Sequence, residues 1–299
     1  MSEHSSCAVI GSSGMVGHAL VRRLCDLGHE VYAVQRKLSP ADDARATYIY
    51  GDVADETTSS QFLGKVETVF YAAAYKKNLQ VHTTQPFQVY VQNELPFLQF
   101  LSAAASAPPT RIVFLGSIYA EHAPTIPTVG AFDGYSAAKC AEEYALEAFA
   151  KEYQTTCIFL RVAPIYGPGN DVDPRTANMI PSLLQRIHRT EGALEVWGNG
   201  QRRLQMVYID DVVENALQAL SQTTAGLHRI GHPEVVSIDD IVQMAIEASG
   251  KSLTVEHDLA KPDKATELYE FTNLIQPTVG LREGILQTHA WMRENNLYA

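Results

Sequence analysis

The chain has 299 residues, of which 46% are hydrophobic and 19% charged, as is ordinary for a globular protein with a substantial core. Its formal net charge of −11 argues against a general binder of nucleic acid or of anionic membranes. The N-terminal sequence MSEHSSC lacks the basic start of a signal peptide, and no apolar run reaches the length of a membrane span, so we expect a cytoplasmic protein with no membrane partner.

Strand-like and helix-like patterns alternate through most of the chain. Such alternation predicts a parallel sheet covered on both faces, an α/β fold of the Rossmann-type doubly wound class. The expected strands are Cys7–Ile10, Glu30–Val34, Thr47–Tyr50, Thr68–Ala72, Arg111–Leu115 and Thr156–Val162, and the expected helices are His18–Leu27, Pro86–Ala105 and Tyr135–Lys151.

The pattern becomes less regular from about Gly167, with further helices expected at Ile238–Ser249 and Leu281–Asn295. We therefore predict a dinucleotide-binding domain in residues 1–167, to which segments near 204–222 return. Residues 168–299 are expected to form mainly a smaller α/β substrate-binding region. The four cysteines show no CxxC or CxxH spacing, so we expect them to be small apolar residues and expect no metal site.

Three glycines separate the first expected strand from the first helix, in the sequence AVIGSSGMVGHAL. Gly11, Gly14 and Gly17 provide a tight turn, a close backbone approach to a pyrophosphate, and close packing of helix against strand. The spacing is GxxGxxG rather than GxGxxG, but its position in the first strand–helix unit favours a dinucleotide cofactor.

The second strand ends without a carboxylate, in Gln35, Arg36 and Lys37. An acidic residue here usually binds the ribose 2′-hydroxyl of NAD, whereas cations suit the 2′-phosphate of NADP. We therefore predict NADP(H) rather than NAD(H), unless Arg36 and Lys37 are only solvated surface charges. Asp52, after the third strand, either accepts a hydrogen bond from the adenine amino group or caps a turn.

Ser117, Tyr135 and Lys139 form the candidate catalytic set. Ser117 follows an expected strand at the carboxyl edge of the sheet, and Tyr135 and Lys139 lie four residues apart on a helix, which places them on one face. A phenol is a weak base at neutral pH, so a neighbouring ammonium and a cationic nicotinamide are expected to lower its pKa toward the working range. Tyr135 would then exchange a proton with a substrate oxygen, which Ser117 stabilises by a hydrogen bond.

The motifs GSSGMVG, YGDVAD, VFYAAA, FLGSIYA, YSAAK, LRVAPIYGPG, NMIP, VWGNG and VYIDDV resemble the extended short-chain dehydrogenase/reductase family of NAD-dependent epimerases and dehydratases. Within the family, AAAYKKNLQVHTTQPFQVYVQN and KPDKATELYEFTNL resemble the nucleotide-sugar epimerase/reductases of the GDP-L-fucose synthase type. The resemblance implies a nucleotide-sugar substrate and a homodimer formed through a four-helix bundle of helices like Pro86–Ala105 and Tyr135–Lys151.

The resemblance also implies the binding residues. Cofactor contacts are expected at Gly11, Ser13, Gly14, Met15, Val16, Gly17, Arg36, Lys37, Asp52, Val53, Ala72, Ala73, Ala74, Asn93, Tyr135, Lys139, Ala163, Pro164 and Ile165. Substrate contacts are expected at Ser117, Ile118, Tyr119, Asn178, Arg186, Arg202 and Arg203.

The chain departs from the patterns of fucose synthase and related enzymes at three places. The segment after Ser117 reads IYAEH without the cysteine used for epimerisation, and Asn178 stands where the family has a histidine. The usual arginine and acid before the VYIDD-like strand are replaced by Leu204 and Gln205, with Arg202 and Arg203 earlier in the sequence.

These departures favour a reductase of a nucleotide-linked 4-keto-6-deoxy sugar that does not perform the double epimerisation. A 4-epimerase or dehydratase with a retained NAD(P), and a ketone or aldehyde reductase of a non-nucleotide metabolite, remain as alternatives. A non-enzymatic dinucleotide sensor is disfavoured because both Tyr135 and Lys139 persist.

Overall fold

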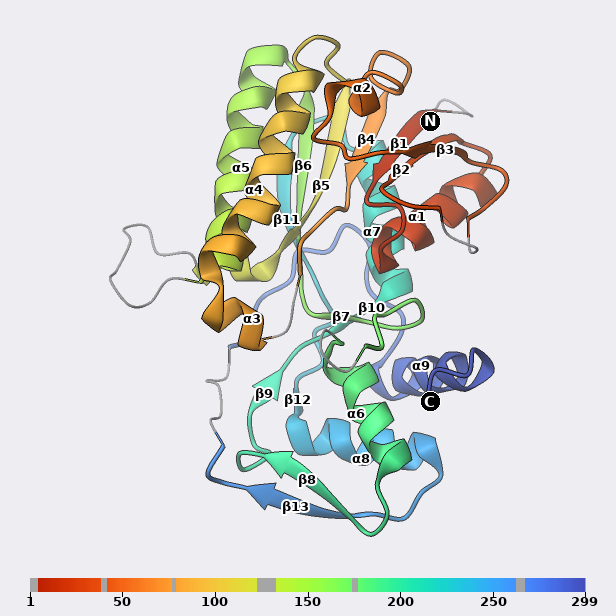
Figure 1. Cartoon of the computed structure of the whole chain (residues 1–299), viewed down its shortest axis with the longest axis vertical. Coiled ribbons are helices and arrows are strands. Elements are labelled where there is room, and N and C mark those ends of the chain that lie inside the picture. The colour runs from red at the N-terminus through yellow and green to blue at the C-terminus, as the bar shows by residue number, and fades with distance from the viewer. Residues whose placement is uncertain are drawn as a thin grey trace.

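The computed structural model describes residues 5–38, 42–76, 79–122, 133–173, 177–261 and 267–298. Seven strands in this part of the chain form one parallel sheet in the order β11-β6-β5-β4-β1-β2-β3 (Figure 1). Most of their side chains are buried on both faces, as expected for a covered parallel sheet. The strands are β1 Ser6–Ile10, β2 Glu30–Gln35, β3 Thr47–Tyr50, β4 Thr68–Tyr71, β5 Arg111–Ser117, β6 Thr156–Val162 and β11 Gly226–Ile230.

Helices cover both faces of the sheet and separate its core into two clusters. On one face, α1 (Met15–Asp26) packs against α7 (Ile209–Gln218), and on the other α4 (Pro86–Ala104) lies along α5 (Gly134–Tyr153) (Figure 1). The α4–α5 side is rich in aromatic rings, with Phe97 on α4 at 5.3 Å from Phe114 on β5. Short segments complete this lobe: α2 Glu56–Ser59, α3 Leu79–Thr84, and the 3₁₀ turns η1 Ile118–His122 and η2 Ala219–Ser221.

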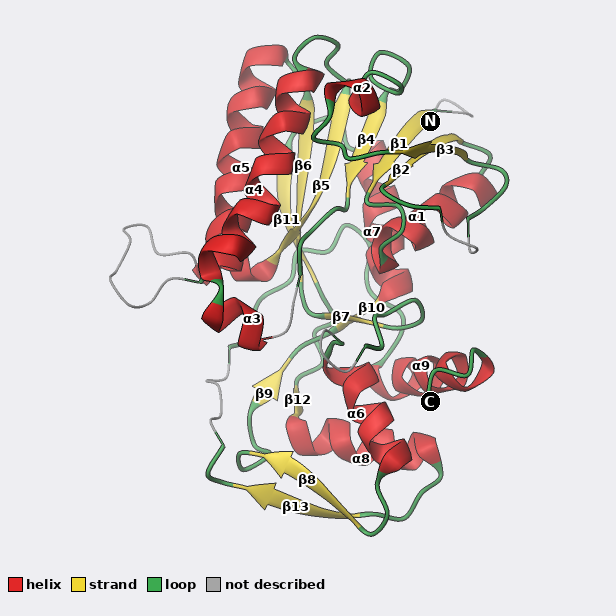
Figure 2. Cartoon of the chain, in the orientation of Figure 1, coloured by secondary structure: helices red, strands yellow, loops and turns green. Residues whose placement is uncertain are grey.

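A smaller lobe lies beyond the carboxyl ends of the strands (Figure 2). It contains three helices and two-stranded pairings, of which β7–β10 lies nearest the main sheet. Its elements are β7 Ile165–Tyr166, α6 Met179–Arg189, β8 Ala193–Trp197, β9 Arg203–Leu204, β10 Val207–Tyr208, β12 Val236–Ser237, α8 Ile238–Ser249, β13 Thr254–Asp258 and α9 Leu281–Glu294.

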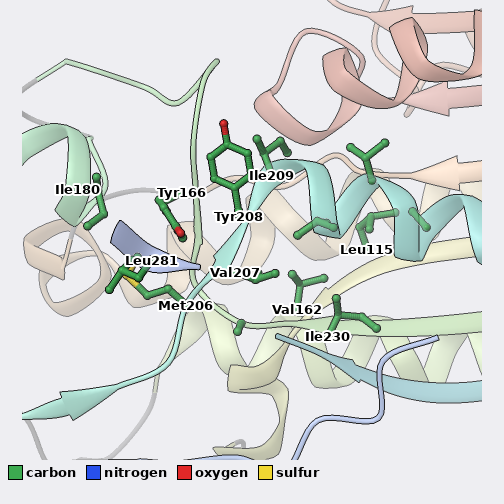
Figure 3. Packing of buried hydrophobic residues seen from close by; sticks show 14 of the residues in the cluster. Leu115, Val162, Tyr166, Ile180, Met206, Val207, Tyr208, Ile209, Ile230 and Leu281 are labelled. Atoms are coloured by element: carbon green, nitrogen blue, oxygen red, sulfur yellow. The ribbon is translucent and has the colours of Figure 1, made fainter. Parts of the chain in front are cut away.

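The two lobes share a continuous apolar core. Figure 3 shows Val162 and Ile230 at the ends of their strands, next to Val207 and, farther into the smaller lobe, Leu281. All four side chains are buried. Because this cluster crosses from the sheet into the smaller lobe, the loops at the carboxyl edge of the sheet are held between two packed bodies.

The structure confirms the predicted α/β class and doubly wound sheet. The segments that return to the main lobe are α7 and β11, and β11 lies beyond the range 204–222 named from the sequence. Residues 123–132, which precede Tyr135, and residues 262–266 of the tail motif lie outside the described residues. Within the described ranges, no helix is both long and apolar enough to cross a bilayer. All four cysteines are free thiols.

Candidate active site

The turn between β1 and α1 requires glycine at two of its three positions. Gly11 has φ of +84°, and a Cβ there would lie 2.7 Å from the backbone nitrogen of Ala73. At Gly17 a Cβ would lie 2.2 Å from the carbonyl oxygen of Gly11. Gly14 begins α1, whose first turn contains no acidic side chain. The turn therefore leaves backbone N–H groups and a positive helix end open to an anion, which fits the pyrophosphate of a dinucleotide.

A pocket of about 310 Å³ opens beside this turn. It lies at the carboxyl ends of β1, β2 and β4 and includes many of the residues that the sequence singles out. The predicted cofactor residues in its lining are Gly11, Ser13, Gly14, Arg36, Asp52, Val53, Ala72, Ala73, Ala74 and Asn93, and the sequence did not single out Ile10, Val34, Gln35, Gly51, Tyr71, Tyr75, Gln92 and Pro96 as binding residues.

The other predicted cofactor residues lie outside this pocket lining. Met15, Val16 and Gly17 belong to the first turn of α1, and Lys37 is exposed after β2. Tyr135 and Lys139 are on α5. Ala163, Pro164 and Ile165 follow β6 at the same edge of the sheet, where the Ala163 N–H donates to Ile230 O of β11.

A carboxylate lies near the end of β2, although the strand itself ends without one. The buried Gln35 accepts a hydrogen bond from the Ser12 hydroxyl at 2.9 Å and donates from Nε2 to both oxygens of Asp42, at 2.9 and 3.0 Å. The Tyr50 hydroxyl also donates to Asp42, at 3.1 Å. Arg36 lines the pocket beside this group. This end of the pocket thus contains the Arg36 guanidinium and, near it, the Asp42 carboxylate, which already accepts hydrogen bonds from Gln35 and Tyr50.

Asp52 and Asn93 have local hydrogen bonds in addition to their places in the pocket lining. The Asp52 carboxylate accepts from Ala54 N at 3.0 Å, which is the turn-capping role considered from the sequence. Asn93, which is 3% exposed, accepts from Tyr75 N at 2.8 Å and donates to the carbonyl oxygens of Tyr75 and Val89. Its amide therefore holds the loop after β4 in position against α4.

Ser117, Tyr135 and Lys139 meet at the carboxyl end of β5. Asp133 caps α5 and fixes its first turn, since its carboxylate accepts from Tyr135 N at 3.1 Å and from the Ser136 hydroxyl at 2.6 Å. Lys139 is 1% exposed, with Nζ 5.9 Å from the centre of the Tyr135 ring. A hydrogen bond with Ser117 is among the interactions that lower the pKa of Tyr135. The three side chains therefore form one cluster that can act on a single oxygen atom.

The charges around Tyr135 differ from the expectation drawn from sequence. Burial raises the pKa of Tyr135 most strongly; the Lys139 ammonium lowers it and the Glu142 carboxylate raises it, so that it lies above its ordinary value. Glu142 Oε2 accepts from Lys139 Nζ at 2.7 Å, and both side chains are 1% exposed. Burial lowers the pKa of Lys139, but Glu142, Tyr135 and Glu94 together raise it above its usual value. The ammonium persists, but its effect on the phenol is partly cancelled.

One histidine among the described residues, His82, lies near Tyr135; from the sequence it could assist proton transfer, but a lone histidine is more often a surface or core residue. His82 on α3 has its ring centre 5.4 Å from that of Tyr135, and its Nδ1 is 3.9 Å from Asp133. His122 instead lies against Tyr119 and forms a 2.6 Å hydrogen bond with the Tyr269 hydroxyl. Only the tertiary packing of α3 against the start of α5 reveals the first of these contacts.

The predicted substrate residues fall into two groups. Around the catalytic cluster, Tyr119 is partly buried, and the charges of Arg202 and Glu267 act on its phenol. Arg202 Nε is buried and has no hydrogen-bond partner within the described residues. Ile118, the first residue of η1, is completely buried. Arg203 is exposed on β9, next to Asp240.

The second group lies on α6, farther along the smaller lobe. Asn178 immediately precedes α6, and its Nδ2 donates to Asn170 Oδ1 at 3.0 Å. Arg186 is exposed and donates to the carbonyl oxygen of Glu195 on β8. Within the described residues no group of three or more His, Cys, Asp or Glu side chains is arranged to bind a metal ion.

The doubly wound sheet, the glycine turn and the Ser–Tyr–Lys cluster together define an extended short-chain dehydrogenase/reductase enzyme. The model of the NAD dependent epimerase/dehydratase family matches residues 7–238, and the chain belongs to that family. Its cofactor is accordingly a nicotinamide dinucleotide.

Similarity to individual proteins extends over almost the whole chain. Probable GDP-L-fucose synthase 1 of Oryza sativa subsp. japonica is 25% identical over an alignment of 313 positions, gaps included, and the alignment covers 97% of this chain and 93% of that protein. The dTDP-4-dehydro-6-deoxy-D-allose reductase of Streptomyces bikiniensis is 24% identical, with 96% of each chain covered. The structure of UDP-glucose 4-epimerase from Thermotoga maritima has a TM-score of 0.84 at 24% identity, covering 97% of this chain and 99% of the other.

Proposed function

We propose that the protein is an NADP(H)-dependent reductase of the keto group of a nucleotide-linked 4-keto-6-deoxy sugar. The observation that carries the proposal is the position of Tyr135, which is partly buried, lies beside Ser117 and is next to a buried lysine paired with Glu142. Reduction of a ketone needs a proton donor at the oxygen, and a phenol with a raised pKa retains its proton until a stronger base is present. The similarity to a dTDP-linked deoxysugar reductase and to a fucose synthase supports the substrate class.

In this proposal, each residue of the cluster has a separate role. Bound NADPH supplies the hydride. Tyr135 donates its hydroxyl proton to the carbonyl oxygen as negative charge develops there, and Ser117 stabilises the same oxygen by a hydrogen bond. Lys139 keeps a positive charge near the resulting phenolate, which limits the free energy needed to remove the proton from Tyr135.

Recognition of the nucleotide sugar is proposed for the side of the cluster that faces the smaller lobe. Arg202 has a buried Nε with no hydrogen-bond partner in the described part of the chain, its charge acts on Tyr119, and a guanidinium is well suited to bind phosphate or sugar oxygens. The described segment after Ser117 is the short turn η1, which contains no cysteine, and Asn178 leads into α6 where fucose synthases have a histidine. These features support reduction without the two epimerisations.

The preference for NADP(H) over NAD(H) rests on Arg36. Its guanidinium lines the pocket at the end of β2, where a ribose 2′-phosphate would bind. Asp42 is the opposing charge nearby, but Gln35 and Tyr50 already satisfy its oxygens by hydrogen bonds. We propose that the uncommitted guanidinium, rather than this occupied carboxylate, decides which cofactor binds more tightly.

A homodimer through α4 and α5 is part of the proposal. The two helices lie side by side on one face of the sheet (Figure 1). Leu95 and Leu98 on α4 and Tyr144 on α5 are 52%, 43% and 69% exposed. Large apolar side chains gathered on one surface commonly mark a protein interface. Pairing this surface with its copy would bury them in a bundle of four helices.

The decisive test is NADPH oxidation with GDP- and dTDP-linked 4-keto-6-deoxy sugars, with product analysis by NMR. We expect turnover with at least one of them, and a loss of about 10²–10⁴-fold in kcat for Tyr135→Phe. Tyr153→Phe, at the far end of the same helix, is the matched control and should retain full activity. Absence of turnover with every such sugar contradicts the proposal.

Two further outcomes distinguish the alternatives. Interconversion of sugar epimers by protein that copurifies with a non-exchanging dinucleotide would identify a 4-epimerase. Reduction of simple ketones, combined with no calorimetric binding of nucleoside diphosphates, would identify a reductase of non-nucleotide metabolites.

A further inference from the structure

Two glutamates on the neighbouring helices α4 and α5 interact electrostatically with each other and with the catalytic lysine. Glu142 is on α5, three residues after Lys139, and its carboxylate is completely enclosed. Glu94 is on α4 and partly buried, and the charges of both Glu142 and Lys139 act on it. Two carboxylates near one ammonium would leave an uncompensated negative charge in a region of low polarity, which is costly.

The hydrogen bonds of the cluster indicate where that charge is relieved. Lys139 Nζ donates to Glu142 Oε2 at 2.7 Å, while Glu94 Oε2 is buried and has no hydrogen-bond donor within the described residues. Protonation of Glu94 would remove its charge without breaking the ion pair of Glu142 and Lys139. Consistent with this, burial and the Glu142 charge raise the pKa of Glu94 to about 7.

Among the described residues, the other ionisable groups near the two glutamates do not supply a positive charge that compensates them. On β4, the buried Tyr71 is a neutral phenol on which both carboxylates and Asp52 act, and burial raises its pKa well above the ordinary value. Tyr90, one turn before Glu94 on α4, also has a raised pKa. On the other side of α5, Glu143 is already paired with Arg161 of β6 at 2.6 Å. Lys139 is therefore the cation that balances the pair.

We propose that Glu94 and Glu142 form a carboxyl pair in which Glu94 carries a proton near neutral pH while Glu142 stays ionised beside Lys139, and that the pair sets the charge beside the Tyr135 hydroxyl. The pair acts through Lys139 and touches no reacting atom, so both are positioning residues. The inference rests on the proposed function only for its effect on catalysis. With one proton on the pair, the three groups Glu94, Glu142 and Lys139 have no net charge.

The consequence concerns the direction of proton transfer. A Lys139 ammonium without a carboxylate partner would stabilise the Tyr135 phenolate and favour a base. With Glu142 in place that stabilisation is reduced, so Tyr135 remains a proton donor to higher pH. Loss of the Glu94 proton as the pH rises adds a further negative charge behind Lys139, which strengthens the same effect.

The first experiment needs no substrate. Infrared spectra of the full chain, recorded as a pH titration, should show a protonated carboxyl that ionises near neutral pH and is absent in Glu94→Gln. An alkaline absorbance titration of Glu142→Gln, after subtraction of the same protein carrying Tyr135→Phe, should show tyrosinate forming about one pH unit lower than in the wild-type difference. Thermal melts establish that each variant is folded. If Glu142→Gln does not fold, the tyrosinate titration is carried out on Glu94→Gln instead.

The second experiment is the pH dependence of NADPH oxidation. The pH above which activity falls should be about one unit lower in Glu142→Gln than in the wild type. At a fixed pH on this alkaline limb, the variant should therefore be about tenfold less active. Glu94→Gln should shift it in the same direction by less, and Glu147→Gln, an exposed change on the same helix, should leave it in place. If no carboxyl titrates near neutral pH and the Tyr135 titration is the same in Glu142→Gln, the proposal is wrong. If only the sugar assay fails, the proposed function is wrong and the carboxyl pair stands.

Discussion

Replacing Glu94 by glutamine should stabilise the protein at neutral and alkaline pH but not at acid pH. Glutamine has nearly the same shape and can leave its amide where the carboxyl lies, without a charge. The wild-type carboxylate is half-buried beside Glu142, and its pKa is raised to about 7 from an ordinary 4.5. The native state therefore holds a proton on Glu94 that the unfolded chain releases at a lower pH.

The sign and size of the effect follow from linkage. Between about pH 4.5 and 7 the native state binds more protons than the unfolded state, so the free energy of unfolding of the wild type decreases as the pH rises. The full difference of about 2.5 units corresponds to about 3.4 kcal/mol at 1.36 kcal/mol per unit. Solvent screening at a half-buried site reduces this, and we expect about 1–2 kcal/mol.

Urea unfolding of wild type and Glu94→Gln at pH 5, 6, 7 and 8 measures the effect. The stability difference should be close to zero at pH 5 and reach about 1–2 kcal/mol in favour of the variant at pH 8, or roughly 2–4 °C in Tm. Glu147→Gln on α5 is the control for removal of an exposed charge. A difference that does not change with pH, or a variant that is less stable at pH 8, would refute the reasoning.

Three further predictions concern other parts of the molecule. Calorimetric titration should show Arg36→Ala reducing the preference for NADP+ over NAD+ about tenfold, whereas Asp42→Asn should increase it because a negative charge near the phosphate is removed; equal affinities of the wild type for both would count against this. Gly11→Ala places a side chain at φ of +84° against backbone, and should lower the thermal stability and abolish dinucleotide binding; unchanged binding and stability would contradict this account of the turn. Leu95→Glu combined with Leu98→Glu should convert a dimer to a monomer in sedimentation velocity, and a monomeric wild type would disprove the interface.

Much of the main lobe follows from sequence pattern because its signals are local. The strands Thr47–Tyr50 and Thr156–Val162 have the predicted boundaries, and Glu30–Gln35 differs by one residue. Period and composition within each segment are sufficient for such elements. The return of Gly226–Ile230 to the edge of the sheet is different, because nothing within those five residues says which strand they join.

The site shows the same division between local and tertiary information. Four-residue spacing on a helix brings Tyr135 and Lys139 to one face, and the pairing of Lys139 with Glu142 also lies within one helical turn. Asp42 reaches Gln35 only because the chain folds back after β2, and Glu94 comes from another helix. The sequence expectation of a lowered Tyr135 pKa considered the ammonium and the cofactor alone, without burial or the opposing carboxylate.

This charge balance links the architecture of α4 and α5 to the choice between reduction and epimerisation. A 4-epimerase must first remove a proton from a sugar hydroxyl, for which a phenolate stabilised by a free ammonium is the better base. Here the ammonium is committed to Glu142, and partial burial helps to raise the pKa of the phenol, so the ligand-free site begins with the proton in place. The same arrangement that makes Tyr135 a poor base makes it a ready donor to a ketone oxygen, which is why the carboxylates on its far side bear on the direction of the reaction.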